Sequence, residues 1–409
     1  MRRLTSLITI LAALCLTEVA LTTRIVTTGE GDDAHPVQAS SRTFKLRHMY
    51  HYGRVGTLPT VELQHFDEHR TIQESLPPLT KFEVQIRGRD EYVEGSTRIE
   101  DSHQHQLQLE SSRATPNISD KQTVVNLAKM TSDAYLFDPR EPDWLNTSLG
   151  FNFTERFGWD EDGLRGHVFS TEDYSTIVVS FKGTTINPRD KLSGRDRVND
   201  NRLFSCCCAA QNPYRLYGPV CNCPTGYYEC DSGCLTSSLL RNDSYYDAAL
   251  FVTKQVQRMY PAATFWVVGH SLGGSLASLV GLTLDIPSIT FEAPPERLPA
   301  RRIGLLSENS TAPANRATSY HFGNSADPVY MGTCNGFLST CSLWGFSFES
   351  QCHSGRRCTY DTVQDKGWHS NIGNHRINYV IKNVLEAYEA VPECVEEAEC
   401  EDCYNWKFH

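Results

Sequence analysis

The sequence predicts an α/β fold built around a mainly parallel sheet, because short apolar strand patterns alternate with helical patterns along its second half. The clearest sign is a strand–serine–helix unit at residues 264–280. There the apolar run Phe265–Val268 is typical of a strand buried on both faces, and leucines recur at helical spacing after Ser271. The other expected strands are residues 175–181, 288–291 and 319–322, and the other expected helices are residues 121–136, residues 245–259 and a final helix from residue 377.

The composition is that of a globular chain that passes through an oxidising compartment. Its 409 residues, 40% of them apolar, can bury a large core, and a net charge of -11 without a long Lys/Arg run excludes nucleic acid as a partner. Fourteen of the 15 cysteines follow residue 200. This even number favours disulfides, with a zinc knuckle at Cys221-x-Cys223 and Cys230-x3-Cys234 as the alternative. The N-x-S/T glycosylation acceptors, usable only in the secretory route, are Asn117, Asn146, Asn152, Asn242 and Asn309.

The N-terminus carries a signal for the secretory route. Two arginines precede an apolar stretch at residues 4–16, which Glu18 ends. The stretch is shorter than the roughly 20 residues of a membrane span, but no A-x-A-like cleavage site follows it. A cleaved signal and a retained signal anchor therefore both stay open. We expect residues 1–24 to form the signal anchor and residues 25–44 a flexible lumenal stalk.

Four further segments complete the expected organisation. Residues 45–120 lack a clear period and are expected to form a lumenal prefix that packs on the catalytic domain, residues 121–390. A cysteine-rich insertion at residues 186–243 is expected to be a disulfide-held cap near the site, with a stabilised surface loop as the alternative. Residues 391–409 form an acidic, cysteine-rich tail.

The turn around Ser271 has the sequence of a nucleophile elbow. Gly269 and Gly273 stand two positions on either side of the serine, where a side chain would collide with the neighbouring strand or helix. Such a turn holds the serine backbone strained and lifts its hydroxyl clear of the sheet. Ser271 is therefore the expected nucleophile.

A serine nucleophile needs a base and an acid that orients the base, and after an elbow of this kind they follow in the order acid, histidine. Asp327 lies just after the expected strand 319–322 and is the candidate acid. Less well placed alternatives are Asp285, Asp361 and Asp365. His375 directly precedes the final helix and is the candidate base, with His369 in reserve. His270, beside the nucleophile, is expected to pack beneath the turn.

Two preset donors are expected to form an oxyanion hole. The Leu272 amide follows the nucleophile and supplies one donor. The Thr184 amide, with its hydroxyl, is the candidate for the second, because Gly183 lets the end of the preceding strand approach the site closely. No metal site and no cofactor are assigned.

Five motifs together resemble the class 3 lipases, the fungal triacylglycerol lipase branch of the α/β-hydrolases. They are Phe181-Lys-Gly-Thr, Gly269-His-Ser-Leu-Gly-Gly, Phe291-Glu-Ala-Pro, Asn324-Ser-Ala-Asp-Pro-Val and His375 before a terminal helix. Three further segments resemble, more narrowly, the vacuolar autophagy-related lipases of fungi. They are Leu46-Arg-His-Met-Tyr-His-Tyr-Gly, Cys352-His-Ser-Gly and Cys400-Glu-Asp-Cys-Tyr-Asn-Trp. The resemblance runs from about residue 45 to the end of the sequence.

The resemblance implies an α/β-hydrolase fold, and the family's catalytic triad falls on Ser271, Asp327 and His375. It also implies a single-pass type II membrane glycoprotein of Golgi, endosome and multivesicular-body membranes that is delivered to the vacuole lumen. Its partners there would be membrane lipids, namely phospholipid, triacylglycerol and phosphoinositides. Its task would be the lysis of autophagic bodies and multivesicular-body vesicles.

Residues and resemblance together predict a lumenal serine lipase, a carboxylic ester hydrolase of the triacylglycerol lipase or phospholipase type. Two alternatives stay open. A secreted esterase for soluble esters would show no rise in activity at a lipid interface, and a non-catalytic lipid-binding protein of the same fold would not react with a fluorophosphonate probe. The sequence leaves headgroup and acyl-chain preference, disulfide pairing and oligomeric state open.

Overall fold

The computed structural model describes residues 114–147, 150–159, 163–185, 192–209, 218–306, 318–336, 338–397 and 399–409, with the backbone of short strands between residues 49 and 87. The expected signal anchor 1–24, the stalk 25–44, most of the prefix 45–120 and Asn309 lie outside the described residues. Within the described part, no helix has both the length and the apolar character that a membrane crossing requires. The described elements belong to one compact unit, Lys45–Arg70 with Leu76–His409.

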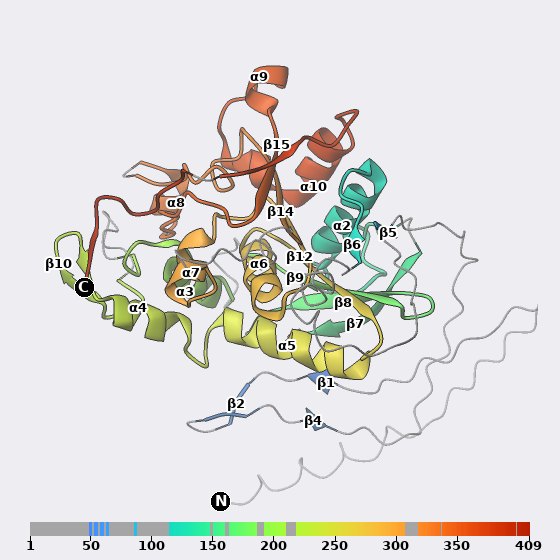
Figure 1. Cartoon of the computed structure of the whole chain (residues 1–409), viewed down its shortest axis with the longest axis horizontal. Coiled ribbons are helices and arrows are strands. Elements are labelled where there is room, and N and C mark those ends of the chain that lie inside the picture. Colours follow the sequence, from blue (N-terminus) through green and yellow to red (C-terminus); the bar gives the residue numbers. More distant parts are fainter. Residues whose placement is uncertain are drawn as a thin grey trace, which may run out of the picture. The chain divides into compact units, whose positions relative to one another are not determined.

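An eight-stranded sheet forms the centre of this unit, and its strands lie side by side in chain order (Figure 1). Five neighbouring strands run parallel: β9 (Thr176–Phe181), β12 (Thr264–His270), β13 (Ser288–Phe291), β14 (Ser319–Asn324) and β15 (Arg356–Tyr360). Antiparallel strands extend both edges: β8 (Gly166–Thr171) and β7 (Phe151–Phe157) beside β9, and β16 (Cys394–Glu396) beside β15. This mainly parallel sheet with connecting helices is an α/β-hydrolase fold, as the sequence predicted.

Both faces of the sheet are buried, which explains why its central strands read as continuous apolar runs. Along β12, Phe265 and Val267 point into one core cluster while Trp266 and Val268 point into the other. All four side chains are at least nine-tenths buried. The period-2 alternation of a strand therefore distributes one apolar run between two layers of helices.

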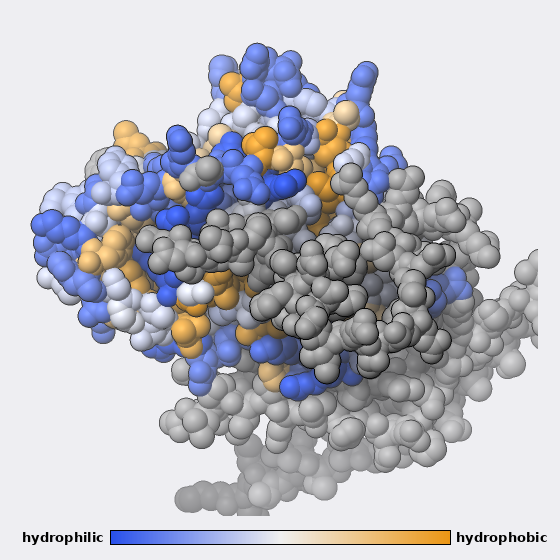
Figure 2. All heavy atoms as spheres, viewed as in Figure 1, coloured by the Kyte–Doolittle hydropathy of each residue, from blue (hydrophilic) through white to orange (hydrophobic). Residues whose placement is uncertain are grey.

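The helices divide between these two layers (Figure 1). Helices α5 (Tyr245–Met259) and α6 (Leu272–Leu284) pack on one face, and α2 (Lys121–Asp133) and α10 (Ile377–Val380) on the other. The remaining helices are α3 (Leu192–Phe204), α4 (Ser232–Leu239), α7 (Arg297–Arg302), α8 (Thr340–Leu343), α9 (Thr362–Lys366), the 3-10 turn η2 (Ile372–His375) and the π-turn η3 (Ile381–Leu385). In the space-filling view the surface over α9 is mostly hydrophilic, with hydrophobic residues beside α10 (Figure 2).

The expected elements match the structure where their apolar pattern is strong. The helix 245–259 and the strand 288–291 have the expected bounds, whereas the helix expected at 121–136 ends at Asp133. Strands β7, β8, β15 and β16 were not predicted. Their sequences mix charged or polar residues with apolar ones, as in Arg356–Tyr360, and so give no clean alternation.

Short strands make up the remaining sheets. A three-stranded sheet joins the insertion to the C-terminus through β10 (Pro224–Gly226), β11 (Glu229–Cys230) and β17 (Lys407–Phe408). Three two-stranded sheets pair β1 (Met49–Tyr50) with β4 (Leu63–Gln64), β2 (Gly53–Val55) with β3 (Leu58–Thr60), and β5 (Ile86–Arg87) with β6 (Thr115–Pro116).

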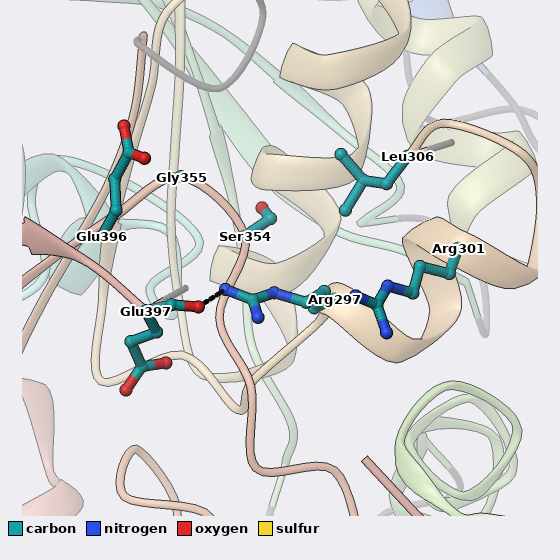
Figure 3. Close-up of a pocket in the computed structure, with 7 residues that line it drawn as sticks. All are labelled: Arg297, Arg301, Leu306, Ser354, Gly355, Glu396 and Glu397. Carbon is teal, nitrogen blue, oxygen red and sulfur yellow. Dashed lines mark hydrogen bonds between the residues drawn. The ribbon is translucent and has the colours of Figure 1, made fainter. Parts of the chain in front are cut away.

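A cavity of about 200 Å³ opens beside α7 (Figure 3). Its lining residues are Arg297, Arg301, Leu306, Ser354, Gly355, Glu396 and Glu397. The Arg297 guanidinium is already engaged there, because it donates to the carbonyl oxygens of His353 and Glu397. None of the lining residues was expected to be functional.

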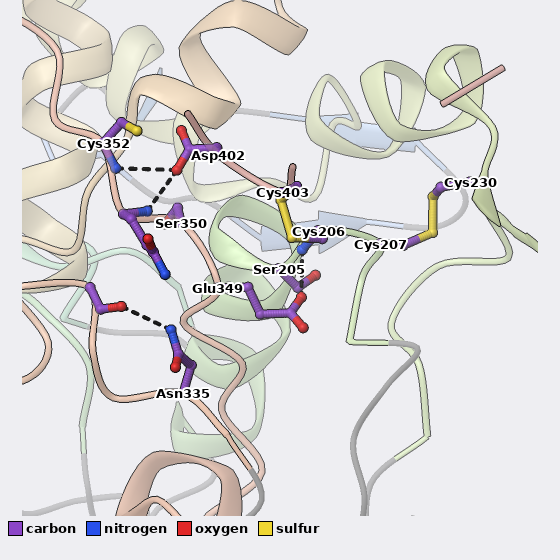
Figure 4. Close-up of a disulfide and its surroundings, with 12 residues drawn as sticks. Ser205, Cys206, Cys207, Cys230, Asn335, Glu349, Ser350, Cys352, Asp402 and Cys403 are labelled. Atoms are coloured by element: carbon purple, nitrogen blue, oxygen red, sulfur yellow. Dashed lines mark hydrogen bonds between the residues drawn. A yellow bond between two sulfur atoms is a disulfide. The ribbon is translucent and has the colours of Figure 1, made fainter. Parts of the chain in front are cut away.

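Disulfides join segments that are distant in the chain (Figure 4). The seven bridges are Cys206–Cys403, Cys207–Cys230, Cys208–Cys221, Cys223–Cys234, Cys334–Cys341, Cys352–Cys400 and Cys358–Cys394. All fourteen cysteines after residue 200 are therefore paired, and the zinc-knuckle alternative for the insertion is excluded. The tail 391–409 is tied to the body by three of the bridges.

We expect the bridge with the longest loop to contribute most to stability. Cys206–Cys403 spans 197 residues and Cys334–Cys341 only seven, so the chain-entropy model gives about 5 kcal/mol for the first and about 2 kcal/mol for the second. Replacing both cysteines of a pair by alanine should lower the thermal unfolding midpoint more for Cys206–Cys403. Equal shifts, measured by calorimetry, would contradict this ranking.

Candidate active site

Ser271 occupies the sharp turn between β12 and α6. Its backbone has φ 56° and ψ -134°, a conformation that costs a non-glycine residue of order 1–3 kcal/mol and persists only where the surroundings impose it. The Ser271 N–H donates to the Phe291 carbonyl on the neighbouring strand at 3.1 Å. The turn is thus fixed to the sheet and presents the hydroxyl at the carboxyl end of β12.

The two elbow glycines stand where no side chain fits. A Cβ added at Gly269 would lie 2.2 Å from the Gly273 carbonyl oxygen, and one added at Gly273 would lie 2.2 Å from the Phe181 carbonyl oxygen. Both obstacles are backbone atoms, which cannot rotate away. A Cβ on Gly183 would likewise lie 2.4 Å from the His270 carbonyl oxygen. The glycines therefore let β9, β12 and α6 approach one another closely around Ser271.

The structure brings the three expected triad residues together. His375 Nε2 lies 2.9 Å from Ser271 Oγ, and His375 Nδ1 lies 2.7 Å from Asp327 Oδ2. Because the carboxylate accepts from Nδ1–H, Nε2 carries the lone pair that receives the serine proton. The reserve candidate His369 is exposed, and its backbone carbonyl accepts a hydrogen bond from the Asn374 side-chain amide.

His270 supports the base from beneath, in the packing position expected for it. Its Nε2–H donates to the His375 carbonyl at 2.8 Å, and its Nδ1 accepts from the Tyr135 hydroxyl at 2.7 Å. Burial lowers the pKa of His270 to about 3, so the ring stays neutral and keeps this tautomer. A chain of hydrogen bonds from α2 therefore positions the backbone of His375.

Glu292 is a residue of the site that the sequence reasoning missed. It follows β13 with φ 46°, is fully buried and hydrogen-bonds with the Asp327 carboxyl group. The Asn324 side-chain amide donates to Glu292 Oε1 at 2.8 Å. A charged residue directly after a buried strand was the available signal.

The two carboxyl groups have pKa values that move in opposite directions. Burial, and then the charge of Asp327, raise the pKa of Glu292 well above its ordinary value of 4.5. Burial acts in the same sense on Asp327, but the charge and hydrogen bond of His375, with hydrogen bonds from Glu292 and the Val329 N–H, hold its pKa below the ordinary range. Glu292 is therefore a neutral acid that donates its proton to the Asp327 carboxylate.

The expected oxyanion donors flank the serine. Leu272 is the first residue of α6, where helix N–H groups have no partner within the helix. Thr184 lies in the loop after β9, beside Gly183, at which an added Cβ would approach Ser271 Cβ to 2.9 Å. The Thr184 hydroxyl donates to Asp200 Oδ2 at 2.8 Å, so the insertion holds this side chain. The backbone amide of Thr184 is therefore the candidate donor to the oxyanion.

Helix α3 brings the start of the cysteine-rich insertion to this loop. Asp200 binds Thr184, and Asp196 Oδ2 accepts from the Thr185 N–H at 2.7 Å. Lys182 Nζ lies 3.9 Å from Asp196. Burial raises the pKa of Asp200 well above its ordinary value. The insertion is thus linked to the candidate oxyanion loop by buried polar contacts, which the sequence pattern of α3 did not indicate.

The described glycosylation acceptors differ in exposure. Asn146 and Asn242 are exposed, whereas Asn117 and Asn152 are half-buried. Asn152 lies on the edge strand β7. Asn146 and Asn242 therefore offer the most accessible acceptors in the described part of the chain.

Fold and site together define a class: an α/β-hydrolase with a strained serine, a histidine and a buried aspartate in hydrogen-bonded sequence. The family model Lipase (class 3) matches residues 198–293. "Putative lipase ATG15" of Saccharomyces cerevisiae (strain S288c) is 46% identical over 326 residues, covering 78% of this chain and 62% of the relative. The protein of the same description from Passalora fulva is 40% identical over 407 residues, covering 92% and 61%. The chain belongs to the class 3 lipase family, and it spans about three fifths of the length of these relatives.

Solved lipase structures resemble the chain more distantly. Lipase II from Rhizopus niveus is 15% identical, with a TM-score of 0.35 and coverage of 62% of this chain and 92% of that one. The mono- and diacylglycerol lipase from Aspergillus oryzae is 17% identical, with a TM-score of 0.33 and coverage of 64% and 96%. The fold assignment therefore rests on the sheet order and the family membership.

Gly273→Ala should abolish the native site. The added Cβ meets backbone atoms of Phe181 and Lys182 at 2.2 and 2.8 Å, so the loop that carries Thr184 must shift. Gly194→Ala is the matched control, because a Cβ there meets no atom of the described residues within 4 Å. We expect the control to keep full reactivity toward a fluorophosphonate probe and Gly273→Ala to lose it. Retained reactivity in Gly273→Ala would contradict the close packing described above.

Glu292→Gln should change the pH dependence of stability. A carboxyl group whose folded pKa is raised contributes stability that is complete below its ordinary pKa of 4.5 and is lost as the pH rises toward the folded value. Glutamine keeps the donor to Asp327 without a titrating proton. The thermal midpoint of the variant should therefore exceed that of the native chain by an amount that grows above about pH 4.5.

Glu292→Leu provides the contrast, since it removes the donor to Asp327. We expect about tenfold lower kcat for this variant, in line with the loss of a hydrogen bond worth about 1–3 kcal/mol, and near-normal kcat for Glu292→Gln at neutral pH. Parallel pH profiles for all three proteins would show that Glu292 serves packing alone.

Proposed function

We propose that the chain is a lumenal serine lipase that hydrolyses the ester bonds of glycerolipids. The observation that carries the proposal is the continuous Ser271–His375–Asp327 hydrogen-bond sequence at a strained elbow. Membership of the class 3 lipase family supports it.

The geometry supports a two-step acyl transfer. Ser271 Oγ attacks the ester carbonyl carbon while His375 Nε2 takes its proton and returns it to the leaving alkoxide, which departs as the alcohol. Asp327 stabilises the imidazolium formed in between, and the proton on Glu292 keeps this carboxylate in place. Water, activated by His375, then cleaves the acyl-enzyme to release the fatty acid. The amides of Leu272 and Thr184 would stabilise the negative oxygen in both steps.

The burial of the site indicates how the substrate would be admitted. Ser271 and His375 are only 5% and 6% exposed, and Asp327 is fully buried. An acyl ester needs an apolar passage that excludes water, so segments over the serine must move before substrate reaches it. We propose that this opening occurs at a lipid surface.

Exposed apolar residues at α8 suit contact with such a surface. Leu338 is 79% exposed, Leu343 47% and Trp344 42%. They lie within seven residues of one another. Phospholipid and triacylglycerol are the substrate classes we propose, with phosphoinositides included among the phospholipids.

A location in the lumen of the secretory and vacuolar route is supported by the seven disulfides, which form in oxidising compartments. Delivery from Golgi and endosomal membranes to the vacuole, and the lysis of autophagic bodies there, complete the proposal. The sequence resemblance to fungal autophagy-related lipases motivates this part.

Substitution of the triad tests the chemistry. Ser271→Ala and His375→Ala should each lower kcat on a nitrophenyl butyrate by about 10³-fold or more, whereas His369→Ala should leave it unchanged. The variants should keep the circular dichroism spectrum and the glycosylation of the native chain. Near-native turnover by Ser271→Ala would overturn the assignment of the nucleophile.

The substrate class is tested by comparing a soluble ester with lipid vesicles. The triple variant Leu338→Ser, Leu343→Ser, Trp344→Ser should lose activity on phosphatidylcholine vesicles while keeping activity on nitrophenyl butyrate. Equal activity of the native chain on soluble ester and vesicle, with no rise at the interface, would favour a secreted esterase instead.

A further inference from the structure

A second cluster of ionisable groups lies outside the triad and has no part in its chemistry. Glu296 precedes α7, His321 lies on β14, and His353 lies in the loop before β15. The side chains of Glu296 and His321 are fully buried, and His353 is 1% exposed. Each offers one ligand atom, and these atoms all lie within 4.8 Å of one another.

Two atoms that face each other in this cluster have no hydrogen-bond partner among the residues that the structure describes. They are Glu296 Oε2 and His353 Nδ1, both buried. The two are 3.6 Å apart, well beyond the 2.7–2.9 Å of a charge-assisted N–H···O bond. If the two groups formed a direct ion pair, these two atoms would stand closer together.

The other nitrogen of each histidine is already engaged. His353 Nε2–H donates to the Tyr330 carbonyl at 2.9 Å, which leaves the lone pair of the neutral ring on Nδ1. His321 Nδ1 is 2.9 Å from the Thr290 hydroxyl, and its Nε2 lies 3.2 Å from the Ser319 hydroxyl and 3.4 Å from Glu296 Oε1. Such outer partners are the usual means of fixing the orientation of metal-bound histidines.

The carboxylate is the anion of the cluster. Glu296 Oε1 accepts hydrogen bonds from the Ser278 and Ser354 hydroxyls, which stabilise the ionised form. A fully buried carboxylate needs a positively charged partner.

We propose that Glu296, His321 and His353 bind one Zn²⁺ ion. Two imidazoles and a carboxylate are a donor set that zinc prefers. Donor atoms 2.0–2.2 Å from a tetrahedral ion stand roughly 3.3–3.6 Å apart. Glu296 Oε1 lies 3.4 Å from His321 Nε2 and Glu296 Oε2 lies 3.6 Å from His353 Nδ1, so each ring stands at about that separation from one oxygen of the carboxylate. The fourth position is left to the second oxygen of Glu296 or to a water molecule.

The cavity beside α7 adjoins the cluster through Ser354. This residue lines the cavity (Figure 3) and also donates through its hydroxyl to Glu296. The cavity carries Glu396 and Glu397 as well as Arg297 and Arg301. Ser354 is thus the residue that separates the cavity from the carboxylate of the cluster.

The ion would act as a structural fastener. It would join the segment after Glu292, the strand β14 that leads to Asp327, and the loop that Cys352 ties to the tail. Tyr330 stands three residues after Asp327 in the sequence and contacts both histidines of the cluster. Its hydroxyl donates to the His321 carbonyl at 3.0 Å, and its carbonyl accepts from His353 Nε2–H at 2.9 Å. Loss of the ion should therefore lower stability first and activity only as a consequence.

Metal content tests the proposal. The full-length chain should be made in a secretory pathway and purified without a metal-affinity step. It should then contain about one zinc per chain, measured by inductively coupled plasma mass spectrometry. Glu296→Gln and His353→Gln should contain at least about tenfold less. The exposed His369→Gln is the matched control and should keep the zinc.

Cobalt gives a second readout that depends on the native chain alone. After dialysis against dipicolinate, added Co²⁺ should produce the visible absorption of a tetrahedral N/O site, and added Zn²⁺ should remove it and raise the thermal midpoint. No stoichiometric zinc, together with no cobalt absorption and no rise in the midpoint, would overturn the proposal. Zinc retained equally by both variants would place the metal elsewhere and overturn it as well.

Discussion

The contact on which the rest of the site depends is the approach of α6 to the end of β9. Gly273 lets the first turn of the helix come against the Phe181 carbonyl, at a distance where any Cβ would collide with backbone. That approach forces the positive φ of Ser271 and at the same time sets Thr184 beside the serine. The nucleophile and its candidate oxyanion loop are therefore placed by one packing constraint, which the two-layer core on either side of the sheet keeps rigid.

A second constraint acts on the acid. Asp327 must stay ionised although it is fully buried, and a lone carboxylate in that position would take up a proton. His375 on one side and the protonated Glu292 on the other share its charge, while Asn324 holds Glu292. Both acids follow neighbouring parallel strands, β13 and β14, so the sheet itself brings the pair together.

The sequence was most informative where chemistry and local pattern coincide. The glycines around Ser271, Asp327 after its strand and His375 before its helix could all be proposed from the sequence, because each position is set by a turn that only certain residues allow. Glu292 and the α3 aspartates could not, since their role arises from contacts between segments that are far apart in the chain: Glu292 with Asn324, and Thr184 with Asp200. The cysteine pairing escaped for the same reason, whereas strands β7, β8, β15 and β16 escaped because their sequences give no clean alternation.

The bridge between Cys206 and Cys403 determines what happens when a protease cleaves the chain. It encloses five of the eight strands of the central sheet, β12 to β16, in the chain from the end of α3 to the C-terminal tail. A single cut at any peptide bond between these two cysteines opens the loop but leaves both pieces covalently joined, with Ser271, Asp327 and His375 all inside it. Nicking within this region thus changes the number of polypeptides without separating the nucleophile from its base.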